Sequence, residues 1–193
     1  DNAMDADTLV PFFFELQACR ALSYLLLGKN RMGDLGAQHL AHAAHGQHLL
    51  PDPTTPLPDA ISLEPSAQAA AANETEVVWP ALVELDVSRN GLGPDGATSL
   101  QALAAACPRL RGMNASHSNF STHRAAADMG SVLRERTSLT RLDLRHCRLG
   151  RAGTDVMAAA FRTYSSGAVE VDLRGNGAVT RGEVSGSLVF RRL

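Results

Sequence analysis

Apolar residues recur along the chain in one short pattern. Four stretches share it in the form LxxLxLxx(N/C)x(apolar): LSYLLLGKNRMGDLGA from Leu22, LVELDVSRNGLGPDGA from Leu82, LTRLDLRHCRLGRAGT from Leu139 and AVEVDLRGNGAV from Ala168. A fifth stretch, LRGMNASHSNF from Leu110, fits with Met113, Ala115 and Phe120 in the apolar positions. The alternation of apolar and polar residues predicts short strands that bury one face and expose the other.

One polar position of the pattern recurs at a nearly constant interval. It holds Asn30, Asn90, Ser118, Cys147 and Asn176, and the last four are separated by 28, 29 and 29 residues. Glycines that follow this position permit a tight turn, after which each unit is expected to form an amphipathic helix. The inward positions of these helices include Leu40, Ala44, Leu100, Leu103, Ala104, Met157, Ala158 and Phe161. One unit cannot bury its apolar face alone, so the pattern predicts units stacked into a curved solenoid.

These stretches resemble the leucine-rich repeat family, and their 28–29-residue period resembles its ribonuclease-inhibitor-like class. A shared glycine-containing tail supports the class: Gly33-Asp34-Leu35-Gly36-Ala37, Gly93-Pro94-Asp95-Gly96-Ala97 and Gly150-Arg151-Ala152-Gly153-Thr154. The resemblance covers about residues 18–185. It implies an α/β fold, a horseshoe-shaped solenoid with a parallel inner sheet and outer helices. We expect five clear units and one possible degenerate unit.

Residues outside the repeats are expected to cover the ends of the solenoid, which would otherwise expose apolar faces. Residues 1–3, before Met4, are expected to be a remnant of an expression tag. Residues 4–17 are predicted to form an N-terminal capping helix, with Asp7 or Thr8 as its N-cap residue and with Phe12, Phe13 and Leu16 over the first unit. The repeat domain occupies residues 18–193. Its last residues, VSGSLVFRRL, are expected to cover the other end; if they do not, the edge strand at 170–173 is open to self-association.

The interval between Asn30 and Asn90 is 60 residues, close to two periods, and includes an irregular proline-rich segment at 49–62. Prolines cannot donate ladder hydrogen bonds and are poor in a central strand. One interpretation of residues 49–78 is a degenerate repeat, with an extended segment in place of its strand and a helix at 63–74. The alternative is a mobile loop of about 30 residues inserted between two adjacent strands. The sequence leaves both interpretations open.

Composition narrows the classes of partner. The 193 residues include 18 Lys and Arg against 20 Asp and Glu, so no overall field favours nucleic acid or a membrane surface. No apolar run is long enough to span a bilayer. The 3 cysteines have no paired spacing, which favours a reducing compartment and an intracellular, cytoplasmic location. We therefore expect a protein partner, and neither nucleic acid nor a membrane.

Three groups of side chains could in principle form a catalytic, metal or anion site, but each is better explained by a structural or solvent-exposed role. His146 and Cys147 are neighbours, but Cys147 occupies the repeated polar position, so it is expected to point into the core while His146 points to solvent. The histidines of HLAHAAHGQH, which are His39, His42, His45 and His48, recur every third residue, and only neighbouring pairs would converge on a helix. We interpret them as a solvated helix face. The arginines between residues 134 and 151 should point in different directions, and only Arg141 and Arg145 should share the concave face.

The concave face of the horseshoe is the candidate site, because the residues between the buried leucines point into it. Read from strand to strand, one column holds Leu26, Asp86, Asn114, Asp143 and Asp172, and the column two residues later holds Gly28, Ser88, Ser116, Arg145 and Arg174. The candidate partner-binding residues are Glu84, Asp86, Arg89, Asn114, His117, Arg141, Asp143, Arg145, His146, Glu170, Asp172 and Arg174. An acidic column beside a partly basic one suits a polar protein interface. The alternative is that these charges neutralise one another and only keep the face soluble.

The predicted function is non-enzymatic: a protein–protein interaction module, scaffold or adaptor, that binds a protein partner on its concave polar face. We expect no catalytic residue, no metal and no cofactor. Some ribonuclease-inhibitor-like proteins are GTPase activators that supply polar residues from loops at the rim. The resemblance therefore implies one alternative, a GTPase-activating regulator in which Arg89, Asn90 and Arg148 would serve.

Overall fold

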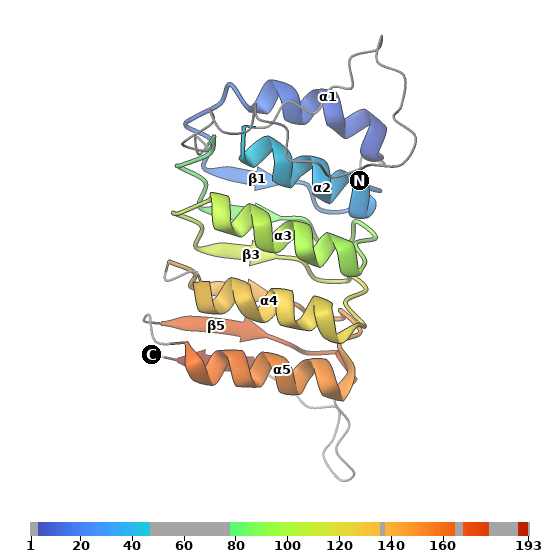
Figure 1. The fold of residues 1–193 in the computed structure, drawn as a ribbon, viewed down its shortest axis with the longest axis vertical. Coiled ribbons are helices and arrows are strands. Elements are labelled where there is room, and N and C mark those ends of the chain that lie inside the picture. Colours follow the sequence, from blue (N-terminus) through green and yellow to red (C-terminus); the bar gives the residue numbers. More distant parts are fainter. Residues whose placement is uncertain (1–3, 47–77, 136–137, 165–167, 178–188, 193) are drawn as a thin grey trace, which may run out of the picture.

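Helices and strands form two stacked layers in the computed structural model, which describes residues 4–46, 78–135, 138–164, 168–177 and 189–192 (Figure 1). The helices are α1 (Ala6–Leu16), α2 (Gly33–Ala44), α3 (Pro94–Ala106), α4 (His123–Glu135) and α5 (Gly150–Thr163). The strands are β1 (Tyr24–Leu26), β2 (Glu84–Asp86), β3 (Gly112–Asn114), β4 (Arg141–Asp143), β5 (Val169–Asp172) and β6 (Val189–Arg192). The prediction of an α/β solenoid with an inner sheet and outer helices is confirmed.

Strands β1–β5 are parallel and lie side by side in chain order. Their central residues are aligned across the sheet and are all buried: Leu25, Leu85, Met113, Leu142 and Val171. The residues on either side of each central residue point to the opposite face, because side chains alternate along a strand. A slip of one residue would expose this whole buried row, so the apolar pattern determines the register.

The repeated polar position holds the stack together from within. The Asn90 amide Nδ2 donates to the carbonyl oxygens of Leu27 and Val87, at 2.8 and 3.0 Å. Asn176 does the same for Leu144 and Leu173, at 2.7 and 2.8 Å. Both side chains are buried. Each asparagine therefore satisfies backbone groups of its own turn and of the preceding unit, which would otherwise be buried without a partner.

Small and apolar side chains line the inner sides of the helices. The predicted inward residues Leu40, Leu100, Leu103 and Met157 are fully buried, whereas Phe161 is only partly buried and packs against the core. The helices therefore form the outer layer of the solenoid by burying one side against the sheet.

None of the described helices is both long enough and apolar enough to span a membrane.

No repeat unit separates β1 from β2. The two strands pair directly, with Leu25 opposite Leu85, and the Leu27 amide donates to the Asp86 carbonyl at 2.7 Å. Residues 47–77, on which most of the predicted degenerate unit falls, lie outside the described residues. The direct pairing contradicts a further unit between these strands and favours the alternative, an insertion between two adjacent strands.

The two ends of the sheet are covered in different ways. At the N-terminal end, Asp5 caps α1 by accepting a hydrogen bond from the Thr8 amide at 3.0 Å, so the prediction of Asp7 or Thr8 as the N-cap residue is wrong. Phe13 of α1 is buried, whereas Phe12, which was expected to pack inward, is 41% exposed. At the C-terminal end, β6 pairs with β5 in the antiparallel direction, so the sheet is not parallel throughout. The edge of β5 is therefore occupied within the chain.

Candidate interaction surface

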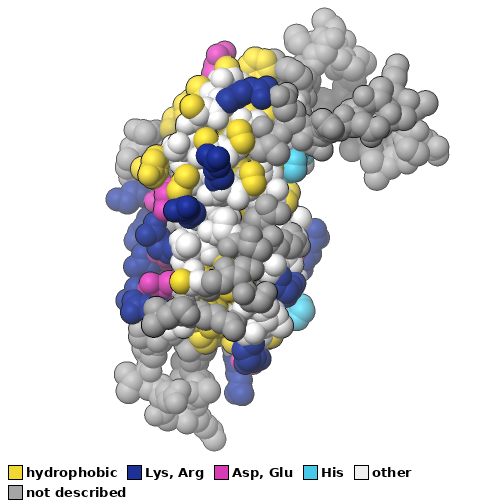
Figure 2. All heavy atoms as spheres, turned by 90° about the vertical axis from the view of Figure 1, so that its left-hand side faces the viewer, with side chains coloured by type: hydrophobic (Ala, Val, Ile, Leu, Met, Phe, Trp, Pro, Cys, Tyr) yellow, Lys and Arg dark blue, Asp and Glu magenta, His cyan; other side chains and the backbone are white. Residues whose placement is uncertain are grey.

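The face of the sheet that is turned away from the helices, here called the inner face, carries the predicted columns of side chains. The first column consists of Tyr24, Glu84, Gly112, Arg141 and Glu170, and the second of Leu26, Asp86, Asn114, Asp143 and Asp172. The third column, which consists of Gly28, Ser88, Ser116, Arg145 and Arg174, follows at the ends of the strands. Figure 2 shows the sheet side at its left margin, where basic and acidic side chains gather. The structure thus brings the predicted residues of the strands onto one surface.

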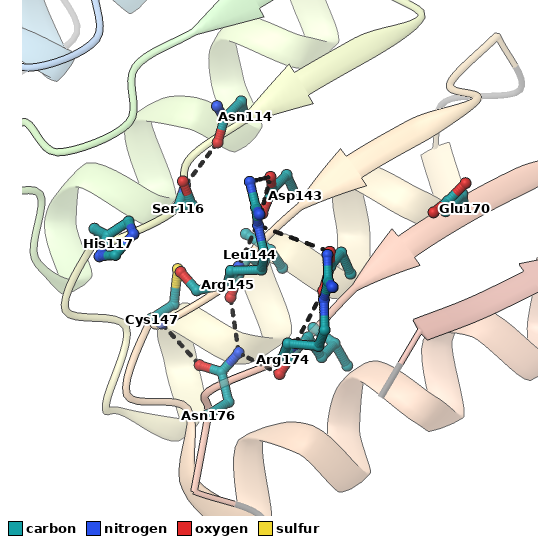
Figure 3. A network of polar contacts seen from close by, with 12 residues as sticks. Asn114, Ser116, His117, Asp143, Leu144, Arg145, Cys147, Glu170, Arg174 and Asn176 are labelled. Atoms are coloured by element: carbon teal, nitrogen blue, oxygen red, sulfur yellow. Dashed lines mark hydrogen bonds and ion pairs between the residues drawn. The ribbon is translucent and has the colours of Figure 1, made fainter. Parts of the chain in front are cut away.

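Charges in the C-terminal half of the inner face pair with one another. Arg145 Nη2 lies 2.6 Å from Asp143 Oδ2, and Arg145 Nε lies 3.7 Å from Asp172 Oδ2. Arg174 holds Asp172 through both Nε and Nη2 (Figure 3). Burial alone would raise the pKa of Asp172, but the hydrogen bonds and charge of Arg174 outweigh it and lower the pKa below its usual value. In this half, the charges neutralise one another.

A glycine allows a second ion pair to cross the inner face. Arg141 Nη2 of β4 lies 2.8 Å from Glu84 Oε2 of β2, although β3 lies between these strands. The pair passes over Gly112, where a Cβ atom would lie only 2.0 Å from the Glu84 carboxylate. Gly112 was not among the predicted site residues. A glycine at an outward strand position was the available signal, since such a residue marks a close approach by another group.

The N-terminal half of the inner face is different in character. Tyr24 and Leu26 of β1 are 65% and 70% exposed. The neighbouring Asp86 accepts a hydrogen bond from the Ser88 amide at 2.8 Å, and it forms no ion pair with any residue that the structure describes. Gly28, beside Asp86, adds no side chain to this region. Two exposed apolar side chains therefore adjoin a carboxylate whose charge is not neutralised.

Arg89, His117 and His146 lie at the rim of the inner face, in the turns that leave the strands. All three have left-handed backbone conformations, with φ of 55°, 61° and 55°. The Arg89 guanidinium donates to His117 Nε2 at 3.0 Å, and the His117 and His146 rings stack with centroids 4.8 Å apart. The alternation of side chains between the two faces of the sheet ends at the third column, one residue before Arg89, His117 and His146. These three residues therefore belong to the rim and not to the inner face.

Comparison with known proteins agrees with this architecture. A family model described as "Leucine Rich repeat" matches residues 80–100 and 136–156, which correspond to the β2 and β4 units. The chain is a leucine-rich repeat protein. Among solved structures, it is similar to the tropomodulin C-terminal domain of Caenorhabditis elegans, with a TM-score of 0.54, 15% identity, and coverage of 84% of this chain and 79% of that chain. No curated protein sequence matches it. Leucine-rich repeat domains generally mediate protein–protein interactions.

Cys147 has a structural role in this leucine-rich repeat protein. Its side chain is fully buried, and its thiol donates to the Ala115 carbonyl at 3.3 Å. Burial raises the pKa of the Cys147 thiol to about 12, so no thiolate forms near neutral pH. His146 is exposed and points elsewhere, toward His117. The adjacent histidine and cysteine therefore do not form a reactive pair.

Thiol labelling tests this arrangement. In the folded protein at neutral pH, we expect iodoacetamide to modify Cys19, which is exposed, and to leave the buried Cys107 and Cys147 largely unmodified. In denaturant, all three should react. Peptide mass spectrometry gives the extent of modification at each site. Native labelling of Cys147 as fast as that of Cys19 would contradict its assignment as a buried structural thiol.

The remaining candidate groups are not assembled into sites. The described histidines of the three-residue series, His39, His42 and His45, are half-buried, so the prediction of a solvated face is wrong: His39 lies near Asp7 of α1, and His45 contacts the Ala102 carbonyl of α3. His48 lies outside the described residues. Within the described ranges, no group of three potential metal ligands occurs. Asn90, one of the residues considered for GTPase activation, is buried and bonded to carbonyl groups inside the stack. It cannot be presented to a nucleotide.

Proposed function

We propose that this leucine-rich repeat protein is an adaptor or scaffold that binds a protein partner on its inner face. The observation that carries the proposal is the exposed pair Tyr24 and Leu26 beside the unneutralised Asp86. Interface energy is usually concentrated in a few residues, among which tyrosine is enriched. Exposed apolar side chains bordered by polar groups are also typical of protein-binding surfaces.

The two halves of the inner face would contribute differently to binding. The Asp–Arg pairs around Asp143 and Asp172 are already neutralised, so they offer a partner little net attraction. Instead, these pairs present polar atoms in fixed orientations, which favour one alignment of the bound partner along the inner face. The N-terminal half supplies apolar contact and one negative charge. The partner segment that fits it carries an apolar side chain next to a lysine or arginine.

The 28–29-residue period supports placing the protein in the ribonuclease-inhibitor-like class. The alternative function of that class, GTPase activation, has less support here. It would depend on Arg89 and Arg148 alone, since the Asn90 amide is used within the fold. We therefore favour the non-enzymatic interaction module.

A double substitution on β1 tests the proposal. We expect Tyr24→Ala/Leu26→Ser to reduce capture of the specific partner from cell extract by at least about 30-fold, because it removes two anchor side chains. Quantitative mass spectrometry of proteins retained on the immobilised wild type and variant measures the effect. Both side chains are exposed, so the fold should be unchanged by circular dichroism.

Leu35→Ser is the matched control, because Leu35 is an exposed leucine on α2, at 52%, in the outer layer. It should retain the partner fully. Asp86→Asn keeps the acceptor for the Ser88 amide but removes the charge, so it should lower the association rate and its dependence on salt. If the Tyr24→Ala/Leu26→Ser variant recovers the same proteins as the wild type, the inner face is not the binding surface.

A further inference from the structure

The loops that follow β1–β5 all leave the sheet on the same side, because these strands are parallel; this is the right-hand side of Figure 1. We call it the exit edge, and it consists of residues 27–33, 87–93, 115–122, 144–149 and 173–177. These ranges contain no Asp or Glu, and the carboxylate of Asp34, which borders them at the start of α2, accepts a hydrogen bond from the Gly93 amide. Their basic residues are Lys29, Arg31, Arg89, Arg145, Arg148 and Arg174, with His117 and His146. The exit edge is therefore cationic, although the chain has a net charge of -2.

Much of this positive charge is not neutralised. Arg145 and Arg174 pair with the aspartates of the inner face. The other four basic residues form no ion pair with any residue in the described part of the chain, and all four are exposed: Lys29, Arg31, Arg89 and Arg148. Asp5 approaches Arg31 through a backbone bridge. Hydrogen bonds from Thr8 lower the pKa of Asp5, and the charge of Arg31 lowers it further, so Arg31 is partly compensated without forming an ion pair.

Equivalent turn positions place four of these side chains in one row. Lys29, Arg89, His117 and His146 all have φ between 55° and 62°. Their backbone amides bond to successive neighbouring units, and the 4.8 Å between the imidazole centroids matches the spacing of adjacent strands. Gly175 occupies the next position, where a Cβ atom would lie 2.3 Å from the His146 ring. The row is therefore ordered by the repeat and ends at a glycine that makes room for the stack.

Two shallow hollows lie along this row, and each is bordered by basic groups. The first is lined by Lys29, Asn30, Arg31 and Arg89. The second is lined by His117, His146 and Arg148, with Gly91, Leu92, Ser118, Asn119 and Gly175. A carboxylate in either hollow would meet donors from more than one unit. Charge-assisted hydrogen bonds of this kind are among the strongest available to a surface.

His117 couples the second hollow to pH. A guanidinium can only donate, so the bond from Arg89 requires His117 Nε2 to be unprotonated. Burial lowers the pKa of His117, and the charges of Arg89, His146 and Arg145 lower it further, while Asp143 acts in the opposite direction. His117 is therefore neutral at neutral pH. An anion bound beside it favours the protonated ring, so anion binding should strengthen as the pH falls.

We propose that the exit edge binds an acidic segment of a partner protein, with carboxylates seated in the two hollows. An acidic peptide fits better than a nucleic acid. Phe120 is the one Phe, Tyr or Trp within the exit-edge ranges, and it is fully buried, while the exposed imidazoles of His117 and His146 already stack on each other, so the edge offers a base no free aromatic platform. The row of donors, about 5 Å apart, suits acidic side chains carried on a peptide backbone.

Binding of fluorescein-labelled hexaglutamate, followed by fluorescence anisotropy at low salt, tests the proposal. We expect Arg89→Ala/Arg148→Ala and Lys29→Ala/Arg31→Ala each to raise Kd by about tenfold, since each removes two charge-assisted contacts. The matched control, Arg109→Ala/Arg162→Ala, removes two exposed arginines outside the exit edge and should change Kd by less than about twofold. Tyr24→Ala/Leu26→Ser should leave Kd unchanged, which separates this surface from the inner face.

A pH series tests the part played by His117. Between about pH 7.5 and pH 5.5 the glutamates stay ionised, and the wild-type Kd should fall by about threefold or more. His117→Gln should lose most of this dependence. Equal weakening by the control variant, or no weakening by the two exit-edge variants, would overturn the proposal. Tighter binding of a single-stranded oligothymidylate than of hexaglutamate would overturn the choice of an acidic protein segment. A Kd that does not change with pH would remove His117 from the site.

Discussion

Replacing Asn90 with alanine is expected to lower the free energy of unfolding by about 3 kcal/mol, because it leaves several buried backbone groups without partners at about 1 kcal/mol or more each. The Asn90 amide donates to the carbonyls of Leu27, Val87 and Ser88 and accepts from the Met32 amide. The side chain is 1% exposed, so water cannot replace it without opening the stack. Urea denaturation followed by far-UV circular dichroism measures the change.

Ser118 supplies the matched comparison, because it occupies the same repeat position with a smaller side chain. Its hydroxyl has a single hydrogen to donate, and it donates this to the Ala115 carbonyl, at 2.7 Å. Ser118→Ala should therefore cost about 1 kcal/mol, and Asn90→Ser should cost less than Asn90→Ala. If Asn90→Ala is no more destabilising than Ser118→Ala, the asparagine does not hold adjacent units together as the hydrogen bonds indicate.

The segments that form the strands could be predicted from the sequence, for a physical reason. Leu85, Leu142 and Val171 are each buried and flanked on both sides by charged residues that point to the other face. A period of two is compatible with a strand and not with a helix. The polar position was equally informative, since Cys147 and Asn176 donate to equivalent carbonyls of the preceding unit, those of Ala115 and Leu144. The regular repeat in the sequence was therefore sufficient to predict the fold.

The arrangement between β1 and β2 could not be predicted by counting periods. An interval of 60 residues equals about two repeats, whether or not it contains one. The direct pairing of Leu25 with Leu85 decides the question, and it depends on contacts between residues 60 positions apart. A local pattern of prolines and alanines holds no information on such a contact.

Alternation predicted which residues share the inner face but not which charges remain available. Arg141 reaches Glu84 across two strand spacings because Gly112 leaves the path open. Asp172 and Arg174 are two residues apart and neutralise one another, whereas Asp86 has Ser88 at the equivalent position. The distinction between the neutralised and the available half of the face follows from these local pairs. This distinction shifts the expected binding energy toward Tyr24 and Leu26, which carry no charge and are not among the predicted partner-binding residues.

Trp79→Ala is expected to lower the free energy of unfolding by about 4 kcal/mol, the range for removing a fully buried aromatic side chain. Trp79 is 0% exposed, and its indole Nε1 donates to the Leu16 carbonyl at the end of α1, at 2.9 Å. The residue thus joins the N-terminal helix to the chain that leads into β2. Its loss would leave a cavity and an unpaired carbonyl where α1 covers the stack. Urea unfolding followed by circular dichroism is the appropriate measurement, because Trp79 is the single tryptophan and its fluorescence is lost.

Trp79→Phe separates packing from hydrogen bonding, since it keeps an aromatic ring and removes the donor to Leu16. It should cost about 1–2 kcal/mol, from the unpaired carbonyl and a smaller cavity. Leu35→Ala, at an exposed helical position, should change stability by less than about 0.5 kcal/mol. A loss below about 1 kcal/mol for Trp79→Ala would show that α1 unfolds separately from the repeats, because a residue in one cooperative unit with them must cost the full value of its burial.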